Sequence, residues 1–285
     1  MNRRMRTYYY AVFGAIGGLI GWHISNLLGL SFIANIYISE AIVGALVGLS
    51  IGLLIGITEG VLTRNLVQIG KSGLFSGLLG LFAGAIGLPL SEWLFQSVGA
   101  GFFGRAIGWG IFGLLIGLAE GVVGRSQVWK GMLGGLLGGS LGGILLEGTQ
   151  RLLKASNIGK AIGLVLLGAA AGAFISLIVV LLSRAWLEVA SGKLKGTEFI
   201  LDKFMRAKGP AIAIGSSALK SEIVLPDPDI APQHAMLTGD GSHFTLKDMS
   251  LSGTFINKRR VERAQLTNNS TILMGNTEMV YHEKR

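Results

Sequence analysis

The first two thirds of the chain consist of long apolar stretches that are separated by short polar segments. A helix needs about 20 mostly apolar residues to cross the hydrocarbon core of a bilayer. The pattern predicts six such membrane-spanning helices, at about 8–30, 40–62, 73–97, 103–123, 131–152 and 159–183. Because no convincing small-residue cleavage site follows the basic start of the chain, we interpret the first stretch as an anchor and not as a signal peptide.

From about residue 185 the pattern changes to short runs of β-branched and aromatic residues, which Gly, Pro, Asn and Asp separate. Many short strands with turn residues between them are typical of a β-sandwich or barrel. Strands are predicted at 187–189, 198–201, 211–214, 234–237, 243–246, 254–257, 271–274 and 278–282. We therefore expect an α-helical membrane domain at residues 1–184 and an all-β domain at residues 185–285.

Two internal echoes group the six predicted helices into three helix-loop-helix hairpins. Gly-Leu-Leu-Ile-Gly-Ile-Thr-Glu-Gly at 52–60 recurs as Gly-Leu-Leu-Ile-Gly-Leu-Ala-Glu-Gly at 113–121, and 104–108 resembles 159–163. Symmetric repeats of this kind occur in transporters. They equally describe a membrane anchor, and both interpretations stay open.

Composition adds a reason for the helices to pack closely, because 37 of the 45 glycines lie in residues 1–184. Many of them recur at every fourth residue, as in Gly44, Gly48, Gly52, Gly56 and Gly60, Gly113, Gly117 and Gly121, and Gly131, Gly135, Gly139 and Gly143. Such a glycine zipper lets two helix backbones approach each other in lipid. The alternative is that the same faces line a pore.

Basic residues set the predicted orientation of the membrane domain, because Lys and Arg prefer the cytoplasmic side of short loops. Eight basic residues fall on one side (Arg3, Arg4, Arg6, Arg64, Lys71, Arg125, Lys130 and Arg184) and four on the other (Arg105, Arg151, Lys154 and Lys160). We expect an integral, multi-pass membrane protein with both termini in the cytoplasm. The net charge of +9 forms no basic stripe with aromatic residues, so nucleic acid is not expected as a partner.

Glu59 and Glu120 occupy equivalent positions of the repeat. Because ionisable residues inside membrane helices often serve transport, these two carboxylates are the candidate transport residues. Each lies five residues before an arginine, Arg64 or Arg125, near the predicted cytoplasmic ends of their helices. We expect both to be interfacial and to pair at the level of the headgroups. The alternative is a functional pair of carboxylates that faces a cavity.

Motifs for catalysis are missing from the sequence. There is no cysteine, no G-x-S-x-G, no Walker-type phosphate loop, and no His and carboxylate pair at metal spacing. We therefore expect neither an enzyme nor a bound metal or cofactor.

The C-terminal part resembles the forkhead-associated (FHA) domain, a β-sandwich whose loops bind phosphothreonine peptides in that family. The residues that carry the resemblance lie in family order and at family spacing, at 187–189, 196–201, 214–217, 223–235, 246–257 and 266–275. The resemblance implies an FHA-type sandwich at residues 185–285.

The same resemblance implies a degenerate phosphate pocket. Ser216 stands where the family has the Arg that clamps the phosphate, Ala231 and Pro232 replace its Ser and second Arg, and Ser252 replaces its Asn. The equivalents of the pocket are Ser216, Ser217, Ala231, Pro232, Ser252 and Thr254, and the residues that would brace the loops are Gly215, His234, Ser250, Gly253 and Asn257. Lys220 and the basic run 258–260 could supply charge from nearby loops.

The leading hypothesis is a membrane-anchored cytoplasmic adaptor that recognises a protein partner through its FHA-like loops, without a requirement for phosphothreonine. The alternative is a transporter or channel that the FHA-like domain regulates. The expected partners are a protein and the lipid bilayer, and assembly of several copies through the glycine faces remains open.

Overall fold

The computed structural model describes residues 3–29, 35–97, 102–123, 127–154, 157–206 and 209–284. Arg125 and the side chains of Arg3, Arg4 and Arg105, which the topology prediction counts, lie outside this description. The chain divides into two compact units. One consists of residues 4–60 and 69–181 and contains most of the helical residues, and the other consists of residues 1–3, 61–68 and 182–285 and contains the strands.

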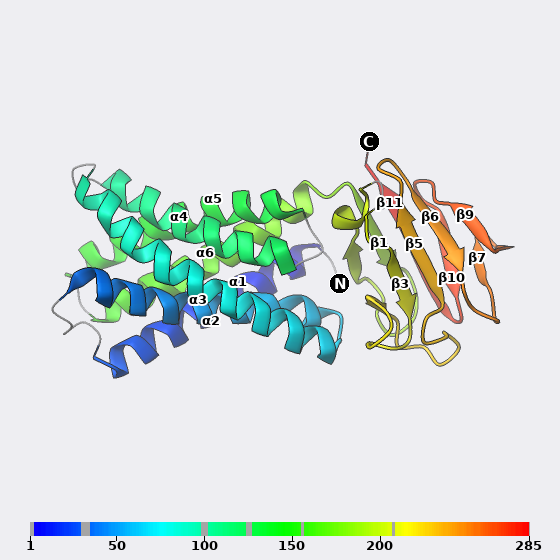
Figure 1. The fold of residues 1–285 in the computed structure, drawn as a ribbon, viewed down its shortest axis with the longest axis horizontal. Coiled ribbons are helices and arrows are strands. Elements are labelled where there is room, and N and C mark those ends of the chain that lie inside the picture. Colours follow the sequence, from blue (N-terminus) through cyan, green and yellow to red (C-terminus); the bar gives the residue numbers. More distant parts are fainter. Residues whose placement is uncertain are drawn as a thin grey trace. The chain divides into compact units, whose positions relative to one another are not determined.

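Six helices form within the described residues, which confirms the predicted number (Figure 1). They are α1 (Arg3–Leu27), α2 (Ile36–Leu62), α3 (Leu66–Ser97), α4 (Phe102–Val123), α5 (Val128–Leu152) and α6 (Asn157–Leu181). Of the described helices, α2, α3, α5 and α6 are long and apolar enough to cross a membrane, and α4 has a shorter apolar stretch at Ala106–Val122. That α1 and α4 also span the membrane remains a prediction.

Asparagine caps explain why two helices begin earlier than the hydrophobic pattern indicates. The side-chain Oδ1 of Asn35 accepts hydrogen bonds from the backbone N–H groups of Tyr37 and Ile38, at 3.0 and 3.3 Å. Asn65 Oδ1 accepts the N–H of Gln68 at 3.0 Å. Such caps satisfy backbone donors that have no partner within the helix. Lys71, which the topology prediction treats as a loop residue, therefore lies inside α3.

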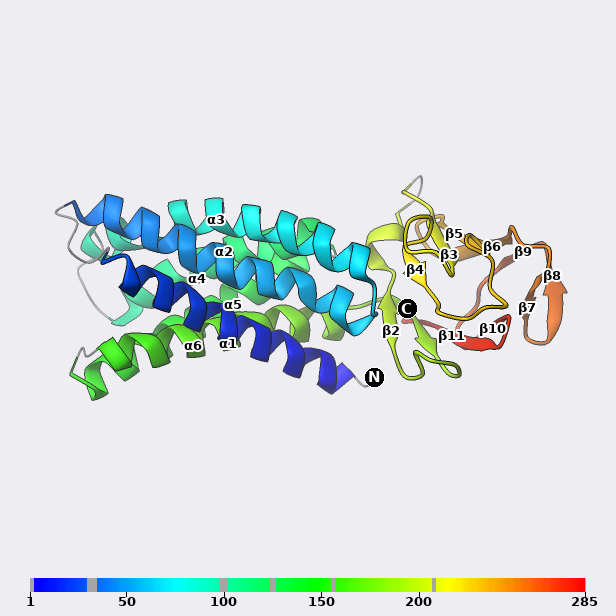
Figure 2. The ribbon, with the colours of Figure 1, turned by 90° about the horizontal axis from the view of Figure 1, so that it is seen from below.

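Glycines lie at the closest approaches between helices that run side by side (Figures 1 and 2). A Cβ atom at Gly48 of α2 would overlap the carbonyl oxygen of Gly80 in α3, and one at Gly117 of α4 would overlap that of Gly131 in α5. A Cβ atom at Gly14 of α1 would likewise overlap the carbonyl oxygen of Gly168 in α6. These backbones pack closely because side chains are absent there.

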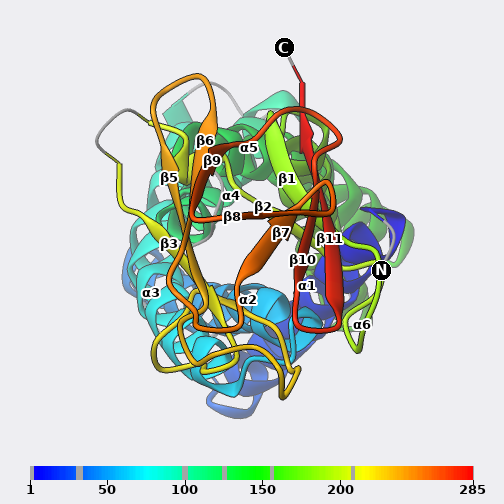
Figure 3. The same cartoon turned by 90° about the vertical axis from the view of Figure 1, so that its right-hand side faces the viewer.

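The strands form a sandwich of two sheets (Figure 3). In the described residues, one sheet has the order β2-β1-β11-β10-β7-β8 and the other β4-β3-β5-β6-β9. The strands are β1 (Ala185–Val189), β2 (Glu198–Ile200), β3 (Ile212–Gly215), β4 (Ile223–Val224), β5 (Ala235–Gly239), β6 (Phe244–Asp248), β7 (Thr254–Ile256), β8 (Arg259–Val261), β9 (Arg263–Gln265), β10 (Thr271–Met274) and β11 (Thr277–Glu283). Only β3 and β4 pair in parallel among them. The prediction of an all-β sandwich is confirmed.

The core of the sandwich lies between the two sheets. Leu187 of β1 and Tyr281 of β11 face Ile214 of β3 and Leu246 of β6, and all four side chains are fully buried. The rings of Phe244 and Tyr281 meet edge to face, with centroids 6.1 Å apart. Alternate residues of each strand supply this core, as expected for stacked sheets. The loops that connect the sheets are thereby held in place at the ends of the sandwich.

Candidate functional site

Three loops of the sandwich meet around residues 231–234, which precede β5. The backbone N–H groups of Ser216 and Ser217, just after β3, donate to the carbonyl oxygens of Ala231 and Pro232, at 3.0 and 3.4 Å. From the other side, Met249 N–H donates to the carbonyl oxygen of His234 at 2.9 Å. The loops 216–222 and 249–253 therefore lie on the two sides of one segment.

His234 is fully buried and connects these loops. The Ala231 N–H donates to its Nδ1 at 3.2 Å, while its Nε2 lies 3.1 Å from Ser250 Oγ and 3.3 Å from the Gly253 carbonyl oxygen. A ring nitrogen that accepts a backbone N–H carries no proton, so the other nitrogen is the donor in the neutral ring. This assigns the Nε2–H tautomer, which donates towards both Ser250 and Gly253.

Asp248, at the end of β6, holds the loop 249–253 in shape. Its carboxylate accepts hydrogen bonds from the hydroxyls of Ser250 and Thr254, both at 2.9 Å, and from their backbone N–H groups, both at 3.2 Å. Burial raises the pKa of Asp248, but the hydrogen bonds from Ser250 and Thr254 outweigh it and hold the pKa below its usual value. The sequence reasoning did not single out Asp248, although its position two residues before Ser250 is typical of an Asx turn.

The predicted pocket residues divide into two groups. Ser216, Ser217, Ala231 and Pro232 lie together through the backbone hydrogen bonds between their loops, and Ser252 is exposed on the third loop. Thr254 differs, because its side chain is fully buried and its hydroxyl donates to Asp248. This contact braces the loop, and the assignment of Thr254 to the pocket stays a prediction.

The other predicted bracing residues also have identifiable contacts. A Cβ atom at Gly215 would overlap the carbonyl oxygen of Pro232, so only glycine allows the two loops to approach there. Gly253 has a positive φ of 86°, which is the left-handed region that favours glycine. Asn257, with φ of 50°, accepts the N–H of Thr271 on its side-chain oxygen at 3.0 Å. These contacts fix the ends of β3 and β7.

Two cations and two apolar side chains accompany these loops, and the first cation, Lys220, is an exposed residue of loop 216–222. Arg260 of β8 donates from Nη2 to the Leu251 carbonyl oxygen at 3.2 Å. Of the basic residues predicted to supply charge, Arg260 is thus placed on loop 249–253. The Leu251 side chain is fully exposed, and that of Leu219, on loop 216–222, is 84% exposed. The loops present hydroxyls, exposed leucines, the Lys220 ammonium and one anchored guanidinium.

The two sheets and the loops that His234 and Asp248 brace define an all-β sandwich with structured loops at one end. The family model "FHA domain" matches residues 212–275, and this part of the chain is an FHA domain. The matched range contains His234, Asp248 and the three loops described above. The predicted resemblance is confirmed.

Known proteins resemble this part of the chain. The glycogen accumulation regulator GarA of Mycolicibacterium smegmatis is 31% identical over 98 residues, which cover 34% of this chain and 58% of GarA, so the chain spans little more than half of that relative. Among solved structures, the FHA domain of CT664 from Chlamydia trachomatis is 26% identical and covers 36% of this chain and 100% of its own, with a TM-score of 0.33. The FhaA FHA domain, solved in complex with the intracellular domain of Rv3910, is 25% identical and covers 34% and 99%, with a TM-score of 0.30.

Glu59 and Glu120 meet inside the helical unit. The Tyr10 hydroxyl of α1 donates to Glu120 of α4 at 2.9 Å and to Glu59 of α2 at 3.4 Å. Glu59 also forms an ion pair with Arg6 of α1, at 3.0 Å, while Arg64 is exposed. Both carboxylate residues are more than 90% buried. The described partners of the two carboxylates are therefore Arg6 and Tyr10 of α1, from a distant part of the sequence, and their pairing at the headgroup level stays a prediction.

Metal ligands do not gather anywhere in the described part of the chain. No group of three or more His, Asp and Glu side chains is arranged there to hold an ion. His23, which stands beside Trp22 in α1, is exposed. The described residues thus offer binding loops and a buried polar cluster as candidate sites.

Proposed function

We propose that the protein is a membrane-anchored adaptor that recruits a protein partner to the cytoplasmic face through its FHA domain, and that it performs no catalysis. FHA domains are protein-interaction modules of the phosphopeptide-binding type, and residues 212–275 form one. Among the described helices, four are long and apolar enough to cross a bilayer, which indicates a membrane protein.

The fully exposed Leu251 carries the proposal that recognition does not require phosphate. An apolar side chain exposed on a rigid loop contributes to binding when a partner covers it. Asp248 and His234 hold this loop in a fixed conformation, so little conformational entropy is lost on binding. In the positions of the family's phosphate-binding side chains stand Ser216, Ala231, Pro232 and Ser252, which offer neutral groups.

The side-chain pattern of α3 supports contact with lipid. Leu74, Leu78, Phe82 and Ile86 recur at every fourth residue and are between 46% and 66% exposed. On another face of the same helix, Gly80 and Gly84 pack against α2. An exposed apolar stripe beside a tightly packed small-residue face is the arrangement expected of a helix in a bilayer.

The experiment compares matched peptides on the full chain in lipid nanodiscs. A library of phosphothreonine peptides and the same peptides without phosphate would be titrated by fluorescence polarisation. We expect ligands whose affinity changes less than about threefold when the phosphate is removed. A loss of affinity of about a hundredfold or more on removing the phosphate would contradict the proposed mode of recognition.

Variants locate the binding surface. Leu251→Ser should weaken a selected peptide about fivefold or more, because truncation of a central interface residue costs more than about 1 kcal/mol. Leu273→Ser, on β10, is the matched control, since its side chain is 38% exposed and lies outside the three loops. Equal effects of the two substitutions would place recognition elsewhere.

Transport is a second candidate, which the meeting of Glu59 and Glu120 favours. Beside them, Nε and Nη1 of Arg6 are buried without a hydrogen-bond partner among the described residues. Buried ionisable groups in membrane helices often belong to ion pathways. Proton flux into proteoliposomes separates the two functions. A flux that Glu120→Gln abolishes supports transport, and a flux equal to that of empty liposomes supports the adaptor alone.

We also propose that several copies of the chain assemble in the membrane. Light scattering of the detergent-solubilised chain over a range of concentrations measures the mass of the particle. A mass that stays at that of one chain would exclude assembly.

A further inference from the structure

The helical unit contains a cavity of about 310 Å³, which no part of the proposed function uses. It lies at the end of the unit where α1 and α5 end and α2 and α6 begin, with Asn26, Glu40, Gln150 and Lys160 among its lining residues. This volume is within the range of small-molecule sites in proteins. Glu59 and Glu120 are not part of its lining, so it is distinct from the buried polar cluster.

The floor of the cavity is apolar and rigid. Val47, Leu88, Leu146 and Leu164 line it and are at most 8% exposed. The Trp109 ring is held from two directions. Its Cβ and Cγ occupy the space that a Cβ at Gly143 would take, and its centroid lies 5.5 Å from that of Phe112, edge to face. A preformed apolar wall of this kind binds a hydrocarbon group at low entropic cost.

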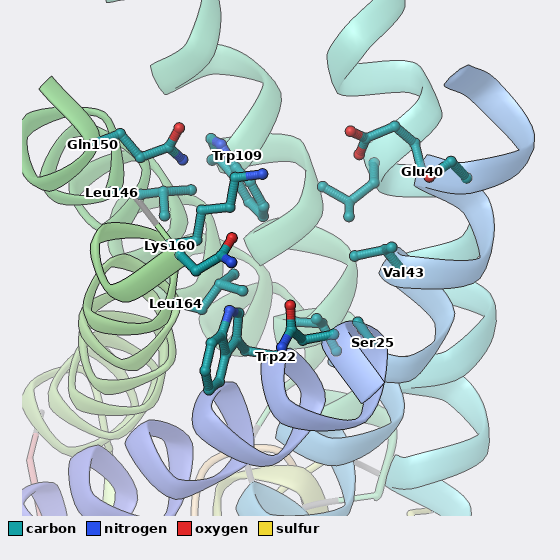
Figure 4. A pocket seen from close by; sticks show the side chains of 14 residues that line it. Trp22, Ser25, Glu40, Val43, Trp109, Leu146, Gln150, Lys160 and Leu164 are labelled. Atoms are coloured by element: carbon teal, nitrogen blue, oxygen red, sulfur yellow. The ribbon is translucent and has the colours of Figure 1, made fainter. Parts of the chain in front are cut away.

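The rim of the cavity carries opposite charges on separate helices. Figure 4 shows the Lys160 ammonium reaching over the cavity from α6, and the Glu40 carboxylate on the wall that α2 provides. The Gln150 amide and the Trp22 indole also line the cavity. A ligand that fits both charges carries an anionic group and an ammonium group, and its apolar part lies against Trp109 and Val47.

We propose that this cavity binds a zwitterion with an apolar body, with its anionic group at Lys160 and its ammonium at Glu40. Two sources have this chemistry, a free apolar amino acid and the headgroup of phosphatidylethanolamine. Phosphatidylcholine matches less well, because its quaternary ammonium has no N–H to donate to a carboxylate. If both termini lie in the cytoplasm, the cavity opens at the non-cytoplasmic face of the membrane. The membrane domain would then act as a receptor for a ligand on that side.

The test uses the full chain in nanodiscs of phosphatidylcholine and follows tryptophan fluorescence and the thermal midpoint. L-Leucine and L-phenylalanine are the free probes. A second set of nanodiscs contains phosphatidylethanolamine in place of about half of the phosphatidylcholine. A ligand that binds only the folded state raises the midpoint. We expect either a saturable response to an amino acid, or a higher midpoint with phosphatidylethanolamine, and the arm that responds identifies the source.

Lys160→Gln and Glu40→Gln should each reduce the response at least about tenfold. The matched controls are Lys154→Gln and Glu92→Gln, which remove the same charges outside the cavity lining. Trp22→Phe should reduce the fluorescence change, to which Trp109 also contributes, and keep the shift in midpoint. The thermal midpoint of each charge variant without ligand checks that it folds. Absence of any response in both arms, or equal effects of cavity and control variants, overturns the proposal.

Discussion

At the scale of single residues, Asp248 holds the recognition loops together. It accepts hydrogen bonds from the hydroxyls and backbone N–H groups of Ser250 and Thr254. Asp248→Ala leaves these donors without an acceptor, which costs about 1–3 kcal/mol in the free energy of unfolding. Thermal unfolding of the sandwich, followed by near-ultraviolet circular dichroism, should therefore shift to lower temperature. Glu262→Ala, at an exposed position, should change it little.

The same carboxylate gives a prediction for acid pH. Hydrogen bonds hold the pKa values of Asp248 and Asp227 below 3.8, their ordinary value, against the opposing effect of burial. A group with a lowered folded pKa stabilises the fold above its unfolded pKa and loses this contribution as the pH falls through the folded value. We expect the free energy of unfolding to fall below about pH 4, and less steeply in Asp248→Asn. Identical acid profiles of the two proteins would contradict this.

At the scale of residues, the sequence indicates contacts that are local. Gly253 and Ser250 brace one loop within a few residues of Asp248, and a motif can indicate such a turn. The partners of Glu59 and Glu120 could not be found in this way. Tyr10 lies 49 and 110 positions away from them, and only the packing of three helices brings the hydroxyl to both carboxylates.

At the scale of elements, the contact between α2 and α3 depends on glycine. Gly48→Ala places a methyl group on the Gly80 carbonyl oxygen, so α2 and α3 must move apart and lose dispersion contacts. We expect a lower midpoint of thermal unfolding in nanodiscs. Gly70→Ala in α3 is the matched control, since its Cβ would meet nothing within 4 Å. It should leave the midpoint unchanged or raise it, because alanine favours the helix by about 1 kcal/mol.

Elements were predicted well where their pattern is long or strongly alternating. The helices α2, α4, α5 and α6 and the strands β3, β5, β6, β10 and β11 follow the hydrophobic pattern within a few residues, whereas α1 and α3 begin five and seven residues before the predicted stretches. The strands β4, β8 and β9 were not predicted. They are short, with two residues in β4 and three each in β8 and β9, and β8 and β9 also carry exposed basic residues. Such segments are strands because a neighbour supplies the pairing, as β6 does for β9.

At the scale of the whole molecule, residues 182–285 should fold as an independent domain. The buried core of the sandwich draws its members from residues 185–281 alone. We expect a single cooperative unfolding transition for this fragment, as small domains usually show. The fragment 212–285 should not fold, because it lacks β1, whose Leu187 and Val189 are fully buried between β2 and β11. Cooperative unfolding of that shorter fragment would contradict the proposed boundary at residue 185.

The orientation of the chain in the membrane is the most direct measurement, because the chain contains no cysteine and single thiols can be introduced anywhere. Ser252→Cys marks the exposed recognition loop, and Lys154→Cys marks the turn after α5. Intact cells would be treated with a membrane-impermeant maleimide. We expect Lys154→Cys to be labelled in intact cells and Ser252→Cys only after permeabilisation. Labelling of Ser252→Cys in intact cells would contradict an FHA domain that recruits partners at the cytoplasmic face.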